Sequence, residues 1–381
     1  MLRRVLTVSL LGLALAGGPA LGQPLKPETE RAIDEAMREA VSTGWTAGGV
    51  VAAMRQGEVV FARGYGLANL ETGTPIASDS VFRIGSITKQ FTAAAVLLLA
   101  EDGKLSLDDP VSRRLAQFPA EDPTTIRQLL THTSGIVDYV GGEGFDREQW
   151  LPHTTDQLVA FVLARTPLHG FEPGADWRYS SSNYALAGAI VEEVSGQPLA
   201  AFLKARIFDP LGMNATAMDD ARDVVPHRAS GYDRLKAEAP GYANAREVSM
   251  SVPFAAGAMR SSAVDLLVWG HALTHGRVLK AESYRQMITP VRLKDGSLPV
   301  RTRADGTRRS ISYGLGVWID GPADRPNLSH DGAIDGFTGT LSIFTGPDVV
   351  VAGLVNTSPS QHLPFGKVIE AVKAEVLAAK K

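Results

Sequence analysis

The feature that most constrains this chain is a single cation in an otherwise apolar helical stretch. After Ser86 the sequence passes Lys89 and continues as TAAAVLLLA from Thr92 to Ala100, and the next charge is Glu101. This run has no polar stripe and is too short to span a bilayer, so it predicts a helix buried in the protein core. Lysine is almost never fully buried without a partner or a chemical task. Any fold that this chain adopts must therefore give Lys89 one or the other.

Ser86 supplies both a partner and a task for Lys89. Residues three apart on a helix are neighbours on one face, so we expect the hydroxyl and the amine to meet. Burial lowers a lysine pKa because the charged form loses its hydration, and the resulting free amine can take the serine proton. The pair predicts a nucleophile with its activator. The same spacing also arises by chance, so a purely structural pair is the alternative.

The beginning of the chain predicts export. Residues 1–22 combine the positive charges of Arg3 and Arg4, an apolar segment over 5–16 and a small-x-small pattern at 20–22, which is typical of a cleaved signal peptide. An uncleaved membrane anchor is the alternative. The chain has no cysteine, which excludes both a lipoprotein anchor and a disulfide. We expect a periplasmic or secreted protein without stable membrane insertion after cleavage.

The composition restricts the class of partner. The chain is 44% hydrophobic and 21% charged, which is ordinary for a globular protein, and its net charge of -3 includes no basic block. Nucleic acid is therefore not expected as the main partner. We expect a small-molecule or peptide substrate and no cofactor. The sequence gives no indication of the oligomeric state.

Hydrophobic periodicity predicts an α/β (α+β) fold, with an antiparallel sheet flanked by helices and a mostly helical second lobe. Helices are expected over 27–42, 86–102, 125–131, 183–195, 199–207, 265–273 and from 366 onward. Strands are expected over 49–54, 58–65, 312–319, 339–345 and 349–356. Both ends of the chain thus contribute strands to one sheet. Residues 23–381 are expected to form one domain, with an α/β lobe over about 23–104 and 290–381 and a helical lobe over about 105–289.

Six segments, taken together and in this order, resemble the serine hydrolase family of class C β-lactamases, penicillin-binding D-alanyl-D-alanine carboxypeptidases and related esterases. They are FRIGSITKQFTAAAVLLLAEDGKLSLDDPV from Phe82, TTIRQLLTHTSGI from Thr124, FEPGADWRYSSSNYALAGAIVEEVSG from Phe171, IFDPLGM from Ile207, AAGAMRSSAVDLLVWG from Ala255 and SHDGAIDGFTG from Ser329. The resemblance implies a β-lactamase or penicillin-binding transpeptidase-like fold. It also implies acyl transfer through a serine.

The resemblance assigns roles to particular residues. Ser86 and Lys89 match the S-x-x-K motif, and Tyr179 matches the tyrosine of the Y-x-N motif. The third motif, K/H-x-G on a strand edge, maps onto His330-Asp331-Gly332. In the family the oxyanion hole is formed by the serine amide and the amide after that triplet, here Ser86 and Ala333. Backbone donors aimed at a developing oxyanion are often the largest catalytic contribution.

The resemblance leaves open which group removes the proton of the Ser86 hydroxyl. A phenol with a pKa of about 10 is a poor base, so Tyr179 would need a pKa depressed by Lys89 and His330 to act as one. Either Lys89 or Tyr179 can then be the general base. His330 is expected to orient Tyr179 and to help bind substrate. Its ionisation is expected to add a limb near ~6.5 to the pH profile of the activity. His132, in the second segment, is interpreted as structural.

Two departures from the family pattern bear on the substrate. Ser181 stands where the second motif has asparagine, and Asn183, two residues later, is expected to cap a helix. Asp331 stands where penicillin-recognising members have threonine or serine, and its carboxylate would repel a substrate carboxylate if it faces the cleft. Both changes weaken the case for penicillins and D-alanyl-D-alanine. They leave esters, amides and amine-bearing substrates open.

We therefore expect an exported serine hydrolase that forms an acyl-enzyme at Ser86 with D-amino-acid-type peptides or esters. A class C-like β-lactamase is the alternative, and so is a weakly active homologue that binds cell-wall peptides without turnover. A metal site around His330, Asp331 and Asp335 is not expected, because the surrounding segment is a turn motif and a third ligand is missing. The loops over 141–170 and 291–310 are expected to determine specificity.

Overall fold

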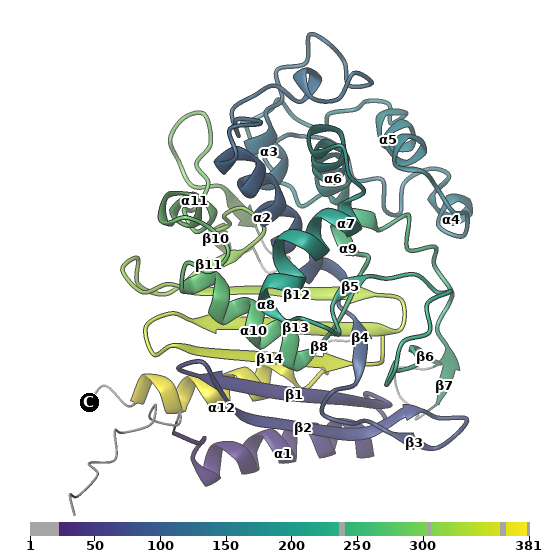
Figure 1. Cartoon of the computed structure of the whole chain (residues 1–381), viewed down its shortest axis with the longest axis vertical. Coiled ribbons are helices and arrows are strands. Elements are labelled where there is room, and N and C mark those ends of the chain that lie inside the picture. The colour runs from purple at the N-terminus through teal and green to yellow at the C-terminus, as the bar shows by residue number, and fades with distance from the viewer. Residues whose placement is uncertain (1–22, 236–240, 303–305, 359–362, 379–381) are drawn as a thin grey trace, which may run out of the picture.

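The computed structural model describes residues 23–235, 241–302, 306–358 and 363–378, so the predicted signal peptide lies outside it. Its largest sheet has seven antiparallel strands in the order β11-β12-β13-β14-β1-β2-β3 (Figure 1). Their bounds are β1 Gly48–Arg55, β2 Glu58–Asn69, β3 Thr74–Pro75, β11 Trp318–Asp320, β12 Asn327–Ile334, β13 Phe337–Phe344 and β14 Val349–Val355. Because β1 pairs with β14, strands from both ends of the chain form one sheet, as the sequence predicts.

The remaining elements lie mostly in the middle of the chain. There are three smaller sheets among the described residues. In the first, β8 (Met259–Ser262) lies between β4 (Val81–Arg83) and β5 (Ala217–Met218). The other two pair β6 (Tyr232–Arg234) with β7 (Tyr242–Asn244) and β9 (Val300–Thr302) with β10 (Arg308–Ser310). The α-helices are α1 Pro27–Ser42, α2 Thr88–Glu101, α3 Ile126–Leu130, α4 Phe145–Glu148, α5 Thr155–Leu163, α6 Ser181–Ser195, α7 Leu199–Leu203, α8 Asp209–Leu211, α9 Phe254–Gly257, α10 Ala263–Thr274, α11 Ala281–Met287 and α12 Phe365–Ala378. Three short turns complete the set: η1 Gly85–Ile87, η2 Val111–Arg113 and the π-type η3 Lys204–Phe208.

The two faces of the sheet pack against different helices. Val51 and Ala53 of β1 belong to a hydrophobic cluster formed with α1 and α12, whereas Val50 and Ala52 belong to the larger core that includes α2 and α10. This division follows from the alternation of side chains along a strand. Helix α1 has its predicted bounds, since its apolar residues recur at helical spacing on one face and Pro27 occupies the first turn.

Helix α2 is buried as predicted, but it begins later than expected. Residues 88–99 are all buried, and Gly103, with φ +70°, lies just beyond the helix end as the sequence predicts. Ser86 lies in the 3-10 turn η1 that leads directly into α2 rather than in the helix itself. The hydroxyl is therefore presented from the turn before the helix, and Lys89 from its first turn.

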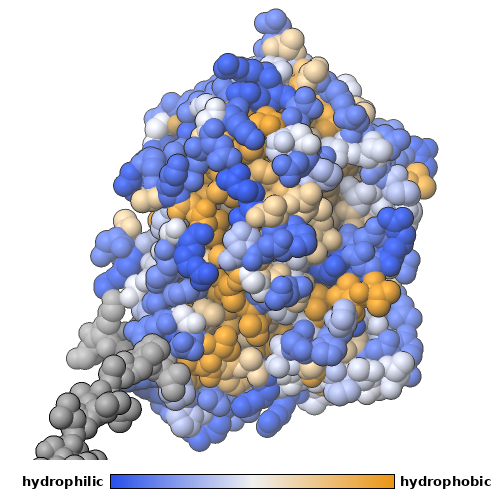
Figure 2. Space-filling view, viewed as in Figure 1, coloured by the Kyte–Doolittle hydropathy of each residue, from blue (hydrophilic) through white to orange (hydrophobic). Residues whose placement is uncertain are grey.

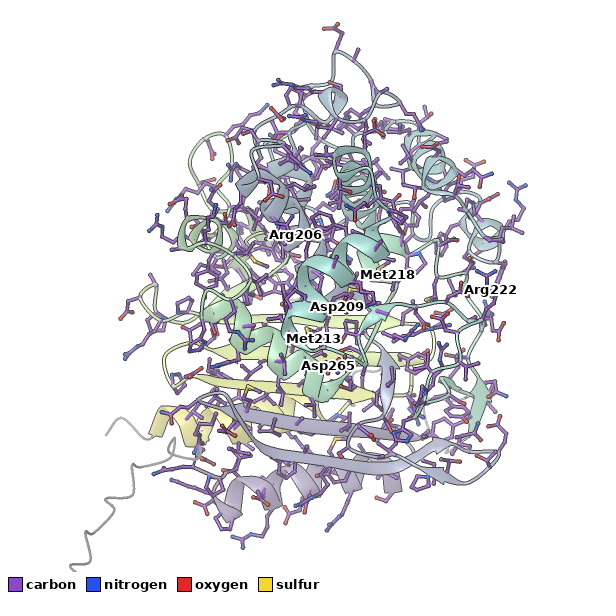
Figure 3. All side chains as sticks on the ribbon, viewed as in Figure 1. Arg206, Asp209, Met213, Met218, Arg222 and Asp265 are labelled. Atoms are coloured by element: carbon purple, nitrogen blue, oxygen red, sulfur yellow. The ribbon has the colours of Figure 1, made fainter. Side chains whose placement is uncertain are left out.

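Helix α10 lies across the sheet on the same side as α2 (Figure 1). It approaches the sheet closely at Gly270, where an added Cβ would lie 2.8 Å from the Val350 side chain. Asp265 in its first turn accepts hydrogen bonds from the Ala215 amide at 2.9 Å and the Thr216 hydroxyl at 2.8 Å (Figure 3). The helix is thus fixed both to the sheet and to the segment that follows α8.

The prediction of a strand over 312–319 is wrong for most of its length. Only Trp318–Asp320 pairs as β11. The preceding apolar residues form a buried turn in which Gly316 has φ +76°, and an added Cβ there would lie 2.8 Å from the Lys89 carbonyl oxygen. A continuous apolar run therefore marks a loop packed against the start of α2, which hydrophobicity alone does not distinguish from a strand.

In the part of the chain that the structure describes, no helix combines the length and the apolar character needed to cross a bilayer. The face in Figure 2 is dominated by hydrophilic residues, with hydrophobic residues in smaller patches between them.

Candidate active site

The predicted nucleophile lies in a pocket where η1, β12 and the start of α6 meet. The pocket has a volume of about 220 Å³. Ser86, Ser181 and Ala333 line it together with a largely apolar set: Tyr139, Val140, Phe145, Val248, Val252, Pro253, Ala256, Gly257 and Ile334. Gln149 and Asp335 are its other polar members. Three residues that the sequence assigns to the site, far apart in the chain, thus share one cavity.

Lys89 has both the partner and the burial that its sequence context predicts. Its side chain is fully buried, and its Nζ donates hydrogen bonds to Ser86 Oγ at 3.0 Å and to the Ala256 carbonyl oxygen at 2.8 Å. Burial lowers the Lys89 pKa to about 7, although the negative charge of Asp138 opposes this fall. A substantial fraction of Lys89 is therefore a free amine near neutral pH, within reach of the serine proton.

Tyr179 differs from its prediction, because its pKa is raised rather than depressed. Burial is the main cause, and the charges of Asp138 and Asp331 act in the same direction. A hydrogen-bonding interaction with the Ser86 side chain opposes the rise without cancelling it. Lys89 Nζ lies 4.8 Å from the centre of the Tyr179 ring, so the cation faces the ring. Tyr179 is a neutral phenol, suited to donating a proton.

His330 is held in one neutral form. It is 2% exposed, and its Nδ1 donates to the Asp331 carbonyl oxygen at 2.6 Å. Its Nε2 therefore accepts from the Tyr313 hydroxyl at 3.1 Å. Burial lowers the His330 pKa to about 3, with the charge of Lys89 as the second cause. The predicted pH limb near ~6.5 is thus wrong, because His330 stays uncharged across that range.

His330 also does not orient Tyr179 by a hydrogen bond. The centres of the two rings are 6.2 Å apart, and the hydrogen bonds of the imidazole go to Tyr313 and to its own strand. The contact between these two predicted site residues is one of packing.

The second predicted oxyanion donor is brought to Ser86 by two glycines. An added Cβ on Gly332 would lie 1.9 Å from the Ile84 carbonyl oxygen, and one on Gly85 would lie 2.6 Å from the Ala333 amide nitrogen. Only glycine lets β12 approach η1 this closely, and Gly85 also has φ +51°. This approach places Ser86 and Ala333 in the same pocket.

Asp331 lies on the cleft side of β12. Along this strand His330 and Gly332 are buried while Asp331 and Ala333 are exposed, as alternation requires. Ala333 lines the pocket, so Asp331 shares its face. The Asp331 charge is also close enough to raise the Tyr179 pKa. A carboxylate therefore stands beside the cleft, which is the condition under which repulsion of a substrate carboxylate is expected.

The second motif is arranged differently from its prediction. Ser181 lines the pocket as the first residue of α6, and the residue that precedes this helix is Ser180. The prediction that Asn183 caps the helix is wrong: Asn183 lies inside α6 and is 1% exposed. Its side chain accepts from the Ser134 hydroxyl at 2.6 Å and is 3.2 Å from His132 Nδ1. The Asn183 side-chain amide therefore forms its hydrogen bonds inside the core and not with a substrate.

His132 packs beneath Tyr179. The ring centres are 4.4 Å apart, and His132 Nδ1 accepts from the Ser180 amide at 3.2 Å. Burial holds its pKa well below the usual range, with the Lys89 charge as the next cause, so the ring is neutral. These contacts agree with the structural interpretation of His132, whose ring supports the phenol that faces Ser86.

Two residues that the sequence analysis did not single out influence the site. Asp138 acts on the pKa of both Lys89 and Tyr179, and its own pKa is raised by burial. Tyr313 supplies the hydrogen bond that fixes His330. Asp138 follows the HTSG segment closely, which is the one signal that could have directed attention to it. Tyr313 lies in the run that was interpreted as a strand.

Comparison with known proteins identifies the family of this chain. Residues 32–371 match a family model described as Beta-lactamase. This chain belongs to the Beta-lactamase family. Among curated relatives, the esterase EstB of Burkholderia gladioli is 34% identical over 326 residues, covering 78% of this chain and 77% of the relative. A D-aminopeptidase of Gluconobacter oxydans is 28% identical over 284 residues, covering 74% of this chain and 52% of the relative.

Not all of these relatives are matched over their full length. A penicillin-binding protein of Bacillus subtilis is 31% identical over 304 residues, or 76% of this chain but only 64% of its own length. The chain thus spans just under two thirds of that relative.

Solved structures of similar fold extend the comparison. A D-stereospecific amidohydrolase from Streptomyces has a TM-score of 0.73 at 30% identity, with 90% of this chain and 97% of the other covered. A D-amino acid amidase from Ochrobactrum anthropi, in complex with L-phenylalanine amide, has a TM-score of 0.75 at 26% identity. The match covers 91% of this chain and 99% of the amidase. Both agree with the predicted fold class.

Proposed function

We propose that this chain is an exported serine hydrolase that forms an acyl-enzyme at Ser86 with D-amino-acid-type amides, peptides or esters. The observation that carries the proposal is the buried Lys89 amine, 3.0 Å from the Ser86 hydroxyl and with a pKa of about 7, beside an open pocket. A protein that only binds peptides has no need of this arrangement, since a buried lysine destabilises the fold.

The pKa directions of Lys89 and Tyr179 support one order of proton transfers. The Lys89 amine takes the Ser86 proton as Oγ bonds to the substrate carbonyl carbon. The amides of Ser86 and Ala333 stabilise the carbonyl oxygen as it becomes negative. Tyr179, a neutral phenol next to Ser86, gives its proton to the departing amine or alcohol as the carbon–heteroatom bond breaks, and Lys89 returns a proton to it. Water then attacks the ester and releases Ser86.

The lining of the pocket favours a substrate whose acyl group is apolar and lies next to a positive or neutral group. Tyr139, Phe145 and Val252 give it apolar walls, whereas Asp335 lines it and Asp331 stands on the cleft side of β12. Carboxylates in these places attract an α-amino group and repel a carboxylate. The names of the D-aminopeptidase and D-amino acid amidase relatives fit such a substrate, and the esterase relative fits the ester alternative.

The deciding experiment compares matched substrates with and without Ser86. The protein lacking residues 1–22 would be incubated with D- and L-phenylalanine amide, a p-nitrophenyl ester and benzylpenicillin, alongside Ser86→Ala. We expect hydrolysis of the ester and a preference for the D-amide, both lost in Ser86→Ala, with an acyl adduct on the native protein by intact mass. Activity that survives in Ser86→Ala would refute the assignment of the nucleophile.

A β-lactamase is the second candidate, favoured by the family match itself. A penicillin adduct that forms and clears quickly would support it over the amidase. Export has a separate test: the protein recovered from the periplasm of an expressing bacterium should begin at Gln23. Full-length protein confined to the cytoplasm would refute export without affecting the proposal for Ser86.

A further inference from the structure

A second cluster of chemically capable side chains lies at the C-terminal end of α10, away from the pocket of Ser86. His271 and His275 are one helical turn apart, and Asp348 directly precedes β14. His271 Nδ1 lies 3.4 Å from Asp348 Oδ1, and His275 Nε2 lies 3.5 Å from Asp348 Oδ2. The three atoms that these residues can offer to an ion all lie within 4.8 Å of one another.

The two imidazoles have lone pairs available at this point. His275 Nδ1 donates to the His271 carbonyl oxygen at 2.8 Å, which leaves Nε2 unprotonated in the neutral ring. A backbone carbonyl in this role is what usually orients a metal-binding histidine. His271 Nδ1 is buried and has no hydrogen-bond partner. A buried ring nitrogen without a partner, beside a carboxylate, requires an explanation.

An ordinary ion pair does not supply that explanation. The His271 nitrogen and the Asp348 oxygen are close but do not form a hydrogen bond. The rings of His271 and His275 are tilted by 33° with centres 3.9 Å apart, so the two imidazoles lie together beside Asp348. A cation between the three side chains gives His271 Nδ1 a partner and also binds His275 and Asp348.

We propose that His271, His275 and Asp348 bind one divalent transition-metal ion of the zinc type. In a tetrahedral site with metal–ligand bonds of about 2.0–2.1 Å, neighbouring ligand atoms are roughly 3.3–3.4 Å apart. His271 Nδ1 and His275 Nε2 each lie close to this distance from Asp348, the first from Oδ1 and the second from Oδ2. Two imidazoles select zinc, nickel or copper over calcium and magnesium, which prefer oxygen ligands. The side chains of His275 and Asp348 are 43% and 28% exposed, which leaves room for water as a fourth ligand.

The position of the site indicates what the ion does. Asp348 also accepts, through its carbonyl oxygen, a hydrogen bond from the Gln56 amide at 2.9 Å, so it contacts the turn between β1 and β2. A bound ion would join the end of α10 to the turn before β14, which contacts the turn between β1 and β2 at the ends of these interior strands (Figure 1). Since binding to the folded state alone stabilises it, the ion is expected to raise the melting temperature. This role is independent of Ser86 chemistry.

The test is a titration of untagged, chelator-treated protein lacking residues 1–22 with zinc chloride, followed by calorimetry and thermal melting. We expect one zinc per chain and a higher melting temperature, with no such effect from magnesium or calcium. His271→Ala/His275→Ala should weaken binding by more than about 100-fold, since even outer-shell partners contribute about 10–100-fold. Asp348→Asn keeps the shape and suits the positive φ of +53°, so it should fold and still lose affinity.

His227→Ala is the matched control. His227 pairs with Asp79 at 2.8 Å on the surface. Because this pair has two residues and the proposed site has three, His227→Ala should leave zinc binding unchanged. The proposal is overturned if the unmodified protein binds no stoichiometric zinc. It is equally overturned if binding survives in both the double variant and Asp348→Asn, or if calcium binds as tightly as zinc.

Discussion

Lys89 is the residue whose ionisation should control the rate. Its pKa of about 7 in the folded protein lies far below the ordinary lysine value of 10.5, so the free amine becomes abundant as pH rises through neutrality. We therefore expect kcat/KM for an uncharged ester to rise about tenfold per pH unit below about 7 and then level off. His330, with its pKa of about 3, should contribute no limb in this range. A pH–rate profile from 5 to 9 measures both.

Two variants separate the amine from the imidazole. His330→Gln should keep the limb near 7 even if its rate is lower, because the titrating group remains. Lys89→Arg keeps a positive charge but removes the base, so we expect kcat to fall by at least about 100-fold, the lower range for general base catalysis. A limb that vanishes in His330→Gln would show that the histidine, and not Lys89, is the titrating group.

Asp331 is the residue that should set the response to penicillins. Its carboxylate lies on the cleft side of β12, where a penicillin carboxylate would meet a like charge. We expect Asp331→Thr to increase the acylation rate by benzylpenicillin about tenfold or more, equivalent to about 1.4 kcal/mol. Stopped-flow acylation followed by intact mass measures this rate. Asp331→Glu retains the charge and should stay slow; a rate in Asp331→Thr equal to that of the parent would contradict the repulsion.

At the scale of elements, the site depends on how closely β12 approaches η1. Gly332→Ala would place a Cβ 1.9 Å from the Ile84 carbonyl oxygen, so the strand must move away from the turn that carries Ser86. Loss of one oxyanion donor costs about 10²–10³ in kcat, and we expect a fall of that size. Gly366→Ala in α12 is the control, because an added Cβ there meets nothing within 4 Å. Equal kcat in the two variants would show that the contact does not position the site.

Local patterns predicted individual elements well where one face of an element is buried. Helix α1 has its predicted bounds, and β13 and β14 lie where alternation and apolar runs place them. The prediction failed over 312–319, because a buried loop with two glycines has the same apolar signal as a strand. It also placed Ser86 in the helix, since sequence does not distinguish a 3-10 turn that continues into an α-helix.

The identity of the site residues could be predicted, whereas their ionisation could not. Ser86 and Lys89 are three residues apart, so local geometry brings them together. The pKa values of Tyr179 and His330 depend on burial and on Asp138, Asp331 and Tyr313, which come from distant parts of the chain. Such contacts arise only from the tertiary fold, and they reversed the predicted direction for Tyr179.

At the scale of the whole molecule, one buried carboxylate joins the two ends of the described chain. Glu375 of α12 pairs with Arg55 at the end of β1 and accepts a hydrogen bond from the Lys26 amide at 3.0 Å. The two side chains are only 4% and 16% exposed. Removing one partner of a buried pair leaves the other charge uncompensated, which costs about 3–5 kcal/mol. We expect Glu375→Ala to destabilise the protein by about 3 kcal/mol in urea unfolding.

The effect of Glu375→Ala should depend on pH. Burial alone would raise the Glu375 pKa, but hydrogen bonds from Arg55 and Thr29 bring it below its usual value. The pair therefore stabilises the protein fully above about pH 4.5, and this stabilisation is lost as pH falls through the lower folded pKa. The difference in unfolding free energy between parent and variant should thus shrink on acidification.

Two further measurements distinguish this global role from an effect on catalysis. Glu375 lies on the α12 side of the sheet, and Ser86 belongs to the layer on the opposite side, so kcat/KM at 25 °C should remain within about twofold of the parent. Glu370→Ala is the control, since Glu370 is 72% exposed and its pair with Lys373 is weak, and it should change stability by less than about 0.5 kcal/mol. If both glutamate variants unfold alike, the two ends of the chain are held together by the packing of α1 and α12 alone.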